Sequence, residues 1–278
     1  MSAHSSHLVG ELTDNHRQTH DWERDALVDL RHGRIERAFA TYAVHDRLHP
    51  AADHPQLVDR ISEHYLDALD RGTRLFDVIA LAATRKNATA LNTAIRNRLQ
   101  QHGRLGTDRD VAGRAFAVGE LVVVNRNDNP RGLLNGTRAV ITTINRRDVT
   151  MHLDDDRTVT VPAAWAADRL RPAYAMTVHK AQGLTVDIAL VDTTGITDRN
   201  AGYVAASRAR HRTELHHTGL DPLLEAMCDD PLTRQPSLQR PDDAIRHLAA
   251  RFRRPAQQHL AVDQLIHERN TPDLGRTR

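Results

Sequence analysis

One strand followed by a helix constrains the fold of this chain more than any other stretch. The run Asp77-Val-Ile-Ala-Leu-Ala-Ala83 is apolar after its first residue, which is typical of a central parallel strand buried on both faces. Residues 86–102 then repeat apolar side chains at helical spacing, and Gly103 follows as a stop signal. A strand joined directly to such a helix is the repeating unit of a doubly wound α/β sheet.

Further elements of the same kind occur on both sides of this unit. Apolar residues at helical spacing predict helices, and short runs rich in apolar and β-branched residues predict buried strands. The predicted helices cover residues 21–31, 56–70 and 199–209, and the predicted strands cover residues 173–176, 185–191 and 213–217. We therefore expect a parallel sheet with helices on both faces, built from residues 1–116 and 164–220.

Residues 117–163 have a different texture. Short β-branched runs are separated there by clusters of Asn, Asp, Gly and Pro that are typical of hairpin turns. The runs cover residues 120–125, 138–144, 149–153 and 158–161. Short antiparallel strands of this kind predict a small β-barrel inserted between strands of the main sheet. After the sheet, residues 221–278 carry amphipathic stretches at 242–252 and about 256–268, and we expect a helical, partly disordered tail.

Composition excludes several classes of protein. Cys228 is the only cysteine, so no internal disulfide can form, and a reducing cytoplasm is the expected compartment. No apolar run is long enough to span a bilayer, so no membrane partner is expected. A formal net charge of +2 argues against a non-specific polycation and favours a local basic face. The 18 histidines lack the ligand spacings of known metal motifs, and no metal site is predicted.

Two strings near the end of the predicted sheet carry the chemistry. Residues 176–185 read Met-Thr-Val-His-Lys-Ala-Gln-Gly-Leu-Thr, and residues 203–210 read Tyr-Val-Ala-Ala-Ser-Arg-Ala-Arg. In this order they resemble motifs five and six of superfamily 1 DNA helicases of the RecD-like and conjugative relaxase-helicase (TraA/TraI) type. The resemblance implies a RecA-like sheet of the P-loop NTPase type. It also implies an SH3-like insertion, which the string Gly119-Glu-Leu-Val-Val-Val-Asn125 resembles in turn.

By this resemblance the chain meets ATP with Mg²⁺ only together with a first RecA-like domain that carries the phosphate-binding loop. Arg208 then matches the arginine finger, which stabilises charge on the γ-phosphate in the transition state. The alternative is an arginine that stabilises a helix C-terminus. Thr177 and His179 are expected at the nucleic-acid backbone, Gln182 between the two sites and Gly183 near the γ-phosphate. The alternative for this string is a buried turn with a hydrogen-bonded histidine.

Two other segments add candidates by the same resemblance. The segment Leu12-Thr-Asp-Asn-His-Arg-Gln18 resembles motif four, which makes Arg17 a second γ-phosphate contact; the alternative is an ordinary exposed arginine. In Ala83-Thr-Arg-Lys-Asn87, the resemblance places Thr84 and Arg85 near a phosphate of the strand. The alternative for this segment is a helix cap formed by Asn87.

The predicted barrel offers a third group of nucleic-acid contacts. Asn125 and Arg126, together with Asn135 or Arg138, are the polar residues expected to meet a strand. Aromatic residues make up only 4% of the chain, which disfavours a platform on which bases stack. Binding would therefore be mostly electrostatic and would weaken steeply with salt.

No Gly-x-x-x-x-Gly-Lys-Ser/Thr sequence occurs in the chain. We therefore expect the C-terminal motor domain of an ATP-dependent helicase that translocates on single-stranded DNA, present as a truncated or split-gene product that is inactive alone. Its partners would be single-stranded DNA and a P-loop domain supplied in trans or lost. The alternatives are a single-stranded nucleic-acid-binding module without hydrolysis and a non-functional remnant.

Overall fold

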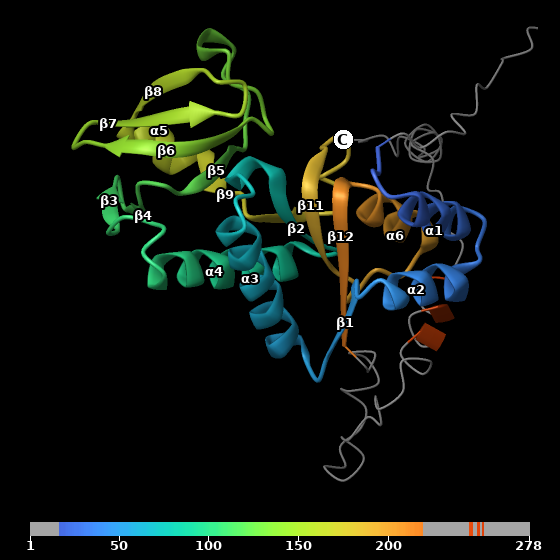
Figure 1. Cartoon of the computed structure of the whole chain (residues 1–278). Helices are drawn as coiled ribbons and strands as arrows, with labels where there is room; N and C mark the ends of the chain where they lie inside the picture. Colours follow the sequence, from blue (N-terminus) through green and yellow to red (C-terminus); the bar gives the residue numbers. More distant parts are fainter. Residues whose placement is uncertain (1–16, 219–244, 247–248, 251, 253–278) are drawn as a thin grey trace, which may run out of the picture.

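The computed structural model describes residues 17–218, 245–246, 249–250 and 252 (Figure 1). Its centre is a five-stranded sheet in which every neighbouring pair is parallel, in the order β1-β12-β11-β2-β10. The strands are β1 (Leu48–Ala51), β2 (Val78–Ala82), β10 (Ala175–Thr177), β11 (Val186–Asp192) and β12 (Ala209–Thr218). The predicted α/β class with a parallel sheet is confirmed.

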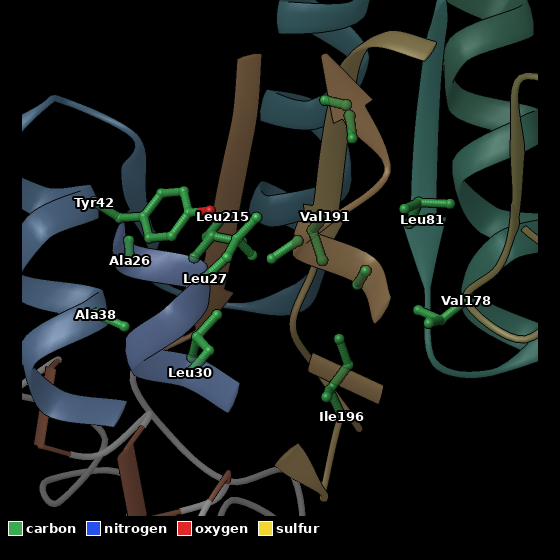
Figure 2. Close-up of a cluster of buried hydrophobic side chains, with 14 of the residues drawn as sticks. Ala26, Leu27, Leu30, Ala38, Tyr42, Leu81, Val178, Val191, Ile196 and Leu215 are labelled. Carbon is green, nitrogen blue, oxygen red and sulfur yellow. The ribbon is translucent and has the colours of Figure 1, made fainter. Parts of the chain in front are cut away.

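Helices cover both faces of this sheet (Figure 1). On one side lie α1 (Asp21–Arg31), α2 (Ile35–Val44) and α6 (Arg199–Ala206), and on the other lie α3 (His54–Asp70) and α4 (Arg85–Gln101). Strand β2 needs both covers because all five of its residues are buried. Ile79 and Leu81 pack toward α1 and α2, whereas the alternate residues Val78, Ala80 and Ala82 pack toward α3 and α4. Figure 2 shows the first of these two clusters, with Leu81 and Val191 facing Leu27 and Leu30.

Short polar side chains cap the start of helices α3 and α6. Asp53 caps α3 by accepting a hydrogen bond from the Gln56 N–H at 2.8 Å. Asp198 caps α6 in the same way, through the Ala201 N–H at 2.8 Å. These caps satisfy backbone donors that have no partner within the helix.

A second sheet projects from one side of the parallel sheet (Figure 1). It is antiparallel, in the order β8-β7-β6-β5-β9. Its strands are β5 (Leu121–Val124), β6 (Arg138–Ile144), β7 (Asp148–Leu153), β8 (Thr158–Pro162) and β9 (Leu170–Pro172). It is accompanied by α5 (Ala163–Arg169), by the hairpin of β3 (Arg109–Val111) and β4 (Arg114–Phe116), and by the 3-10 turn Asn129–Arg131, while a second 3-10 turn, Leu75–Asp77, precedes β2. The predicted strands of residues 117–163 are therefore present, and the SH3-like type stays a prediction.

Elements outside residues 117–163 join this second unit. Strand β9 pairs with β5, and Val111 and Phe116 of the preceding hairpin are buried in the same core. We therefore propose that the inserted unit runs from about residue 109 to 172.

Two elements near the start of the chain were not predicted. Helix α2 packs beside α1, and β1 adds an edge strand that pairs with β12. The four residues of β1, Leu48-His-Pro-Ala51, include a proline and a histidine, and a proline is tolerated in a sheet only at such an edge. Its sequence therefore lacks the apolar run that identifies a central strand.

Part of the predicted tail contacts the core. Ile245, Ala249 and Phe252 are buried against the α1, α2 and α6 side of the sheet. The Phe252 ring lies edge-on to Phe39, with 5.1 Å between ring centroids, and a Cβ added to Gly202 of α6 would overlap the ring. The predicted helix at about 256–268 lies outside the described residues. In the described part of the chain, no helix combines the length and the apolar character that crossing a bilayer requires.

Candidate functional site

The connection from β10 to β11 contains the first predicted string. Residues 178–183 form consecutive turns rather than a helix. The Ala181 N–H donates to the Thr177 carbonyl at 3.0 Å, and the Gln182 N–H donates to the His179 carbonyl at 3.2 Å. Val178 and Ala181 are buried against the core, where Figure 2 shows Val178 near Leu81, whereas His179 and Gln182 are exposed. Alternation of buried and exposed residues thus turns the polar side chains of the string outward.

This connection runs from the carboxyl ends of the parallel strands to their amino ends, which are called here the carboxyl edge and the amino edge of the sheet. Thr177 is paired with Ala82 at the carboxyl end of β2. Val186 is paired with Ala209 at the amino end of β12, and its N–H donates to the Arg208 carbonyl at 3.2 Å. The string therefore begins at the carboxyl ends of the strands, and the chain reaches their amino ends directly after it.

Thr84 and Arg85 lie at the carboxyl edge, two and three residues after the end of β2. The Thr84 hydroxyl accepts a hydrogen bond from the Asn87 N–H at 3.1 Å and caps α4. The alternative interpretation, with Asn87 as the cap, is wrong in its residue, because Asn87 already lies inside the helix and donates to Asp192 at 2.9 Å. Arg85 begins α4 and is exposed.

Lys180 adds a second positive charge beside Arg85. Partial burial lowers the pKa of the Lys180 ammonium, and the nearby charge of Arg85 lowers it further. Because β2 and β10 are neighbours and end in register, Thr177, His179 and Lys180 face the same edge as Thr84 and Arg85. The structure therefore brings together four of the predicted nucleic-acid residues, Thr177, His179, Thr84 and Arg85, and adds Lys180, which was not predicted.

Arg208 is not on the helix that was predicted to carry it. Helix α6 ends at Ala206, with Ser207 as its C-cap, and β12 begins at Ala209. The predicted extent of 199–209 is wrong in its last three residues, because the chain must enter β12 at Ala209 to pair with Val186 of β11. Arg208 thus occupies the short link between helix and strand.

The Arg208 guanidinium is held in place by two hydrogen bonds. Its Nε donates to the Val204 carbonyl at 2.7 Å, and one Nη donates to the Ser207 hydroxyl at 2.9 Å. The first bond is the helix C-terminal interaction of the alternative interpretation, and it is present. Both bonds together leave three of the five guanidinium N–H donors for another partner.

Arg17 lies next to Arg208 although the two are far apart in sequence. An Nη of Arg17 donates to the Ser207 carbonyl at 2.5 Å. The following residue, Gln18, is buried and donates its amide to the Ala209 carbonyl at 2.8 Å. The segment that enters α1 therefore runs alongside the segment that links α6 to β12. Residues 12–16 of the same predicted motif lie outside the described residues.

The electrostatics of this arginine pair favour an anion. Burial lowers the pKa of the Arg208 guanidinium, and the charge of Arg17 lowers it further. Arg208 is 8% exposed and, within the described part of the chain, pairs with no carboxylate. Arg210 differs, since its Nε lies 2.8 Å from a carboxylate oxygen of Asp187 and an Nη lies 3.6 Å from Asp77. Arg210 is therefore neutralised within the fold, whereas Arg208 is not.

Gly183 has a backbone conformation that favours glycine. Its φ is +89°, in the left-handed region, and a Cβ added there would meet no atom within 4 Å. Glycine is therefore favoured here by backbone torsion rather than by lack of space. The open surroundings leave the backbone accessible, as a contact with a phosphate would require.

A cavity of about 460 Å³ separates the turn from the antiparallel sheet. Lys180, Gln182 and Gly183 line one side. The other side includes Asn135 and Arg138 of the inserted unit. Arg208 is not among the residues that line this cavity, so Gln182 and Gly183 face the inserted unit in the isolated chain.

Asn125 and Arg126 follow β5 on the inserted unit. Arg126 is exposed, with an Nη 3.5 Å from a carboxylate oxygen of Asp168. The Asn125 N–H donates to the Arg169 carbonyl at 3.0 Å. The structure therefore groups these two predicted residues with the segment around α5, and not with the residues that line the cavity.

Comparison with known proteins shows that both strings lie in a region that matches one helicase family. The sequence profile of the UvrD-like helicase C-terminal domain matches residues 172–215, which contain β10, the turn, α6 and most of β12. The conjugal transfer protein TraA of Rhizobium radiobacter is 30% identical over 213 residues, which are 74% of this chain. This chain carries the C-terminal domain of a superfamily 1 helicase.

Another relative matches a similar share of this chain. The ATP-dependent DNA helicase Pif1 of Bdellovibrio bacteriovorus is 26% identical over 235 residues, covering 76% of this chain and 50% of the relative. The chain spans 19% of the length of the Rhizobium radiobacter TraA protein. Among solved structures, Bacteroides Pif1 bound to ssDNA is 17% identical with a TM-score of 0.49, and the match covers 71% of this chain and 50% of that one.

Sequence reasoning missed the residues that support the arginine pair. Gln18 and Ser207 hold the entry to α1 against the link before β12, so they position Arg17 and Arg208 in the helicase domain. Ser207 stood inside the second string and could have been selected from it. Gln18 likewise stood at the end of the segment that resembles motif four, but nothing in its spacing indicated that its side chain would be buried against the link before β12.

Proposed function

We propose that this chain is the C-terminal motor domain of an ATP-dependent helicase that moves along single-stranded DNA. The contact of Arg17 and Arg208 at Ser207 carries the proposal, because two guanidinium groups at one point suit a polyphosphate. The names of the relatives, a conjugal transfer protein and an ATP-dependent DNA helicase, support the same substrate classes.

In this proposal the nucleotide is held by a first RecA-like domain and completed by this one. ATP with Mg²⁺ supplies the phosphoryl group that is transferred to water. Arg208 donates hydrogen bonds to the γ-phosphate oxygens as charge builds there, and Arg17 adds a second positive charge. The existing bonds of Arg208 to Val204 and Ser207 fix the guanidinium before the phosphate arrives, so little ordering is needed. Gly183 and Gln182 would meet the same nucleotide from the neighbouring turn.

The carboxyl edge of the sheet is proposed to contact the DNA backbone. Thr84 and Thr177 offer hydroxyl groups, and Arg85 and Lys180 offer positive charge at one edge. Such contacts bind phosphates without reading the base sequence. His179, exposed on the turn, is proposed to join them.

Reconstitution of ATP hydrolysis tests the proposal. The isolated chain should show negligible hydrolysis with or without oligo(dT), because it lacks a Gly-x-x-x-x-Gly-Lys-Ser/Thr sequence. Adding the P-loop-bearing segment of a TraA relative, either separately or fused ahead of this chain, should produce hydrolysis that oligo(dT) stimulates. Substantial DNA-stimulated turnover by the pure chain, or none in either combination although each protein is folded, would contradict it.

A second candidate function is a binding module that grips single-stranded DNA without hydrolysis. The adjacent charges of Arg85 and Lys180 favour it, because they need no nucleotide to act. Fluorescence anisotropy with labelled oligo(dT) should then show binding by the isolated chain. The binding should survive Arg208→Ala and be lost in the Thr177→Ala/His179→Ala double variant. A non-functional remnant would show neither binding nor reconstituted hydrolysis.

A further inference from the structure

Four ionisable side chains from three elements lie together at the C-terminal half of strand β12. Glu214 and His216 are two residues apart on β12 and therefore point to the same face of the sheet. His49 of the neighbouring strand β1 is paired in register with His216. His64 of α3 covers the group from above the sheet. The sequence predicted no metal site, because these residues are spread from position 49 to position 216 and form no compact ligand motif.

The spacing of their donor atoms matches that of ligands around one ion. One Glu214 carboxylate oxygen lies 2.6 Å from His64 Nδ1, 3.5 Å from His49 Nε2 and 3.6 Å from His216 Nε2. All four donor atoms lie within 4.8 Å of one another. Four nitrogen and oxygen ligands in a tetrahedron around zinc, at about 2.0–2.1 Å from the ion, are separated by roughly 3.3 Å. The three distances from Glu214 lie on both sides of that value.

The imidazole of His216 has no hydrogen-bond partner. The side chain is 0% exposed, and neither ring nitrogen is hydrogen-bonded. The Nε2 of His49 is buried and also lacks a hydrogen bond. Buried polar atoms without partners are uncommon in folded proteins because each costs free energy, and a bound ion is a recognised explanation. Here His49 Nε2 and His216 Nε2 lie 3.5 and 3.6 Å from the same carboxylate oxygen of Glu214.

The surroundings resemble the outer shell of a metal site. The second carboxylate oxygen of Glu214 is hydrogen-bonded to Nε of Arg212, which fixes the orientation of the first. A cavity of about 330 Å³ reaches His49, His64 and Glu214 from the surface. It provides an entry path for an ion.

We propose that His49, His64, His216 and Glu214 bind one Zn²⁺ ion. Three imidazole nitrogens and one carboxylate oxygen are ligands that zinc accepts in tetrahedral geometry, whereas Mg²⁺ and Ca²⁺ prefer oxygen ligands alone. The ion would replace the hydrogen bond between His64 and Glu214 and would give His49 Nε2 and His216 Nε2 a partner. It would tie β1, α3 and β12 together, and so stabilise the edge of the parallel sheet. The site is separate from the proposed nucleotide and DNA contacts, and its test does not depend on them.

Zinc titration of the full chain tests this site. After treatment with EDTA and desalting, the wild-type chain should bind one Zn²⁺ with micromolar or tighter affinity in competition with a chromophoric chelator. Zinc should also raise Tm, and the shift should disappear with EDTA. His64→Gln should weaken this binding by at least about tenfold and abolish the shift in Tm. The matched control, His102→Gln, removes an exposed histidine at the end of α4 and should behave as the wild type.

A second measurement keeps the proposal testable if His64→Gln fails to fold. Co²⁺ added to the wild-type chain should give the intense visible absorption of a tetrahedral complex, and Zn²⁺ should displace it at one equivalent. Absence of a one-to-one complex with either ion, or equal zinc affinity in folded His64→Gln and His102→Gln, would overturn the proposal.

Discussion

Removal of the Arg208 guanidinium should separate catalysis from stability in the proposed motor. In the reconstituted motor, an arginine finger contributes about 10³–10⁵ in rate, which corresponds to roughly 4–7 kcal/mol of transition-state stabilisation. Arg208→Ala should therefore lower DNA-stimulated hydrolysis by at least about 10³-fold. The Km for ATP should change much less, because the phosphate contact strengthens in the transition state.

The cost of the same change to folding should be small. Arg208→Ala removes hydrogen bonds to Val204 and Ser207, and each is worth about 0.5–1.5 kcal/mol net. It also removes a nearly buried positive charge that lies beside the charge of Arg17. The burial of this charge and its repulsion by Arg17 both oppose folding, so their loss favours the folded state. We therefore expect the free energy of unfolding to change by less than about 1.5 kcal/mol in urea titrations. Near-cancellation of this kind is the expected signature of a residue placed for a ligand.

Steady-state hydrolysis with saturating oligo(dT) measures the rate. Urea unfolding followed by circular dichroism measures the free energy of unfolding on the same preparations. Arg146→Ala, at an exposed arginine in a turn of the inserted unit, is the matched control and should retain full activity. A folded Arg208→Ala chain that keeps more than about a tenth of the wild-type rate would refute the finger role. An equal loss of activity in the control would show that the loss is not specific to Arg208.

Three further changes probe the scaffold around the site. Gly183→Ala should destabilise the chain by about 1 kcal/mol in urea titrations, because φ is +89° and the surrounding space is open; an unchanged midpoint would contradict the strain. Asn92→Ala should cost about 1–3 kcal/mol by the same measurement, since the Asn92 amide bonds both the N–H and the carbonyl of Ala175 at 3.0 and 2.8 Å. The hydrogen bond to Asp192 raises the pKa of His54, so its stabilisation is complete below the unfolded pKa near 6.5 and is lost as pH rises through the folded value. The urea midpoint should therefore fall between pH 6 and pH 8 by more in the wild type than in His54→Gln, and parallel pH profiles would contradict this.

Elements with strong periodic burial were predictable from sequence. Helix α1 has the predicted bounds, and α3, α4 and β2 lie within two residues of theirs. In each case the apolar stripe is continuous, and caps or glycines define the ends. Strand β11 (Val186–Asp192) lies within one residue of the predicted 185–191, whereas its pairing with β12 was not predicted.

Contacts between distant segments were not predictable in the same way. The Arg17–Ser207 bond joins residues 190 positions apart, and the cluster around Glu214 joins three elements. The end of α6 was misplaced because Ala205 to Arg210 continues a helix-compatible composition, and only pairing of Ala209 with Val186 stops it. Tertiary pairing overrides local propensity at such a boundary.

The short connection between β10 and β11 gives the helicase domain a physical link between its two proposed ligands. Parallel strands normally need a crossover of a dozen or more residues, most often a helix, but eight residues, 178–185, suffice here. Val178 and Ala181 are buried in the same cluster as Ile79 and Leu81 of β2, so the connection stays close to the sheet. A connection this short has few residues whose conformation can change independently of its ends. In the proposed motor, movement of Gly183 on nucleotide binding should therefore be passed to His179, four residues earlier, whereas a helical crossover could absorb it in flexible loops at either end.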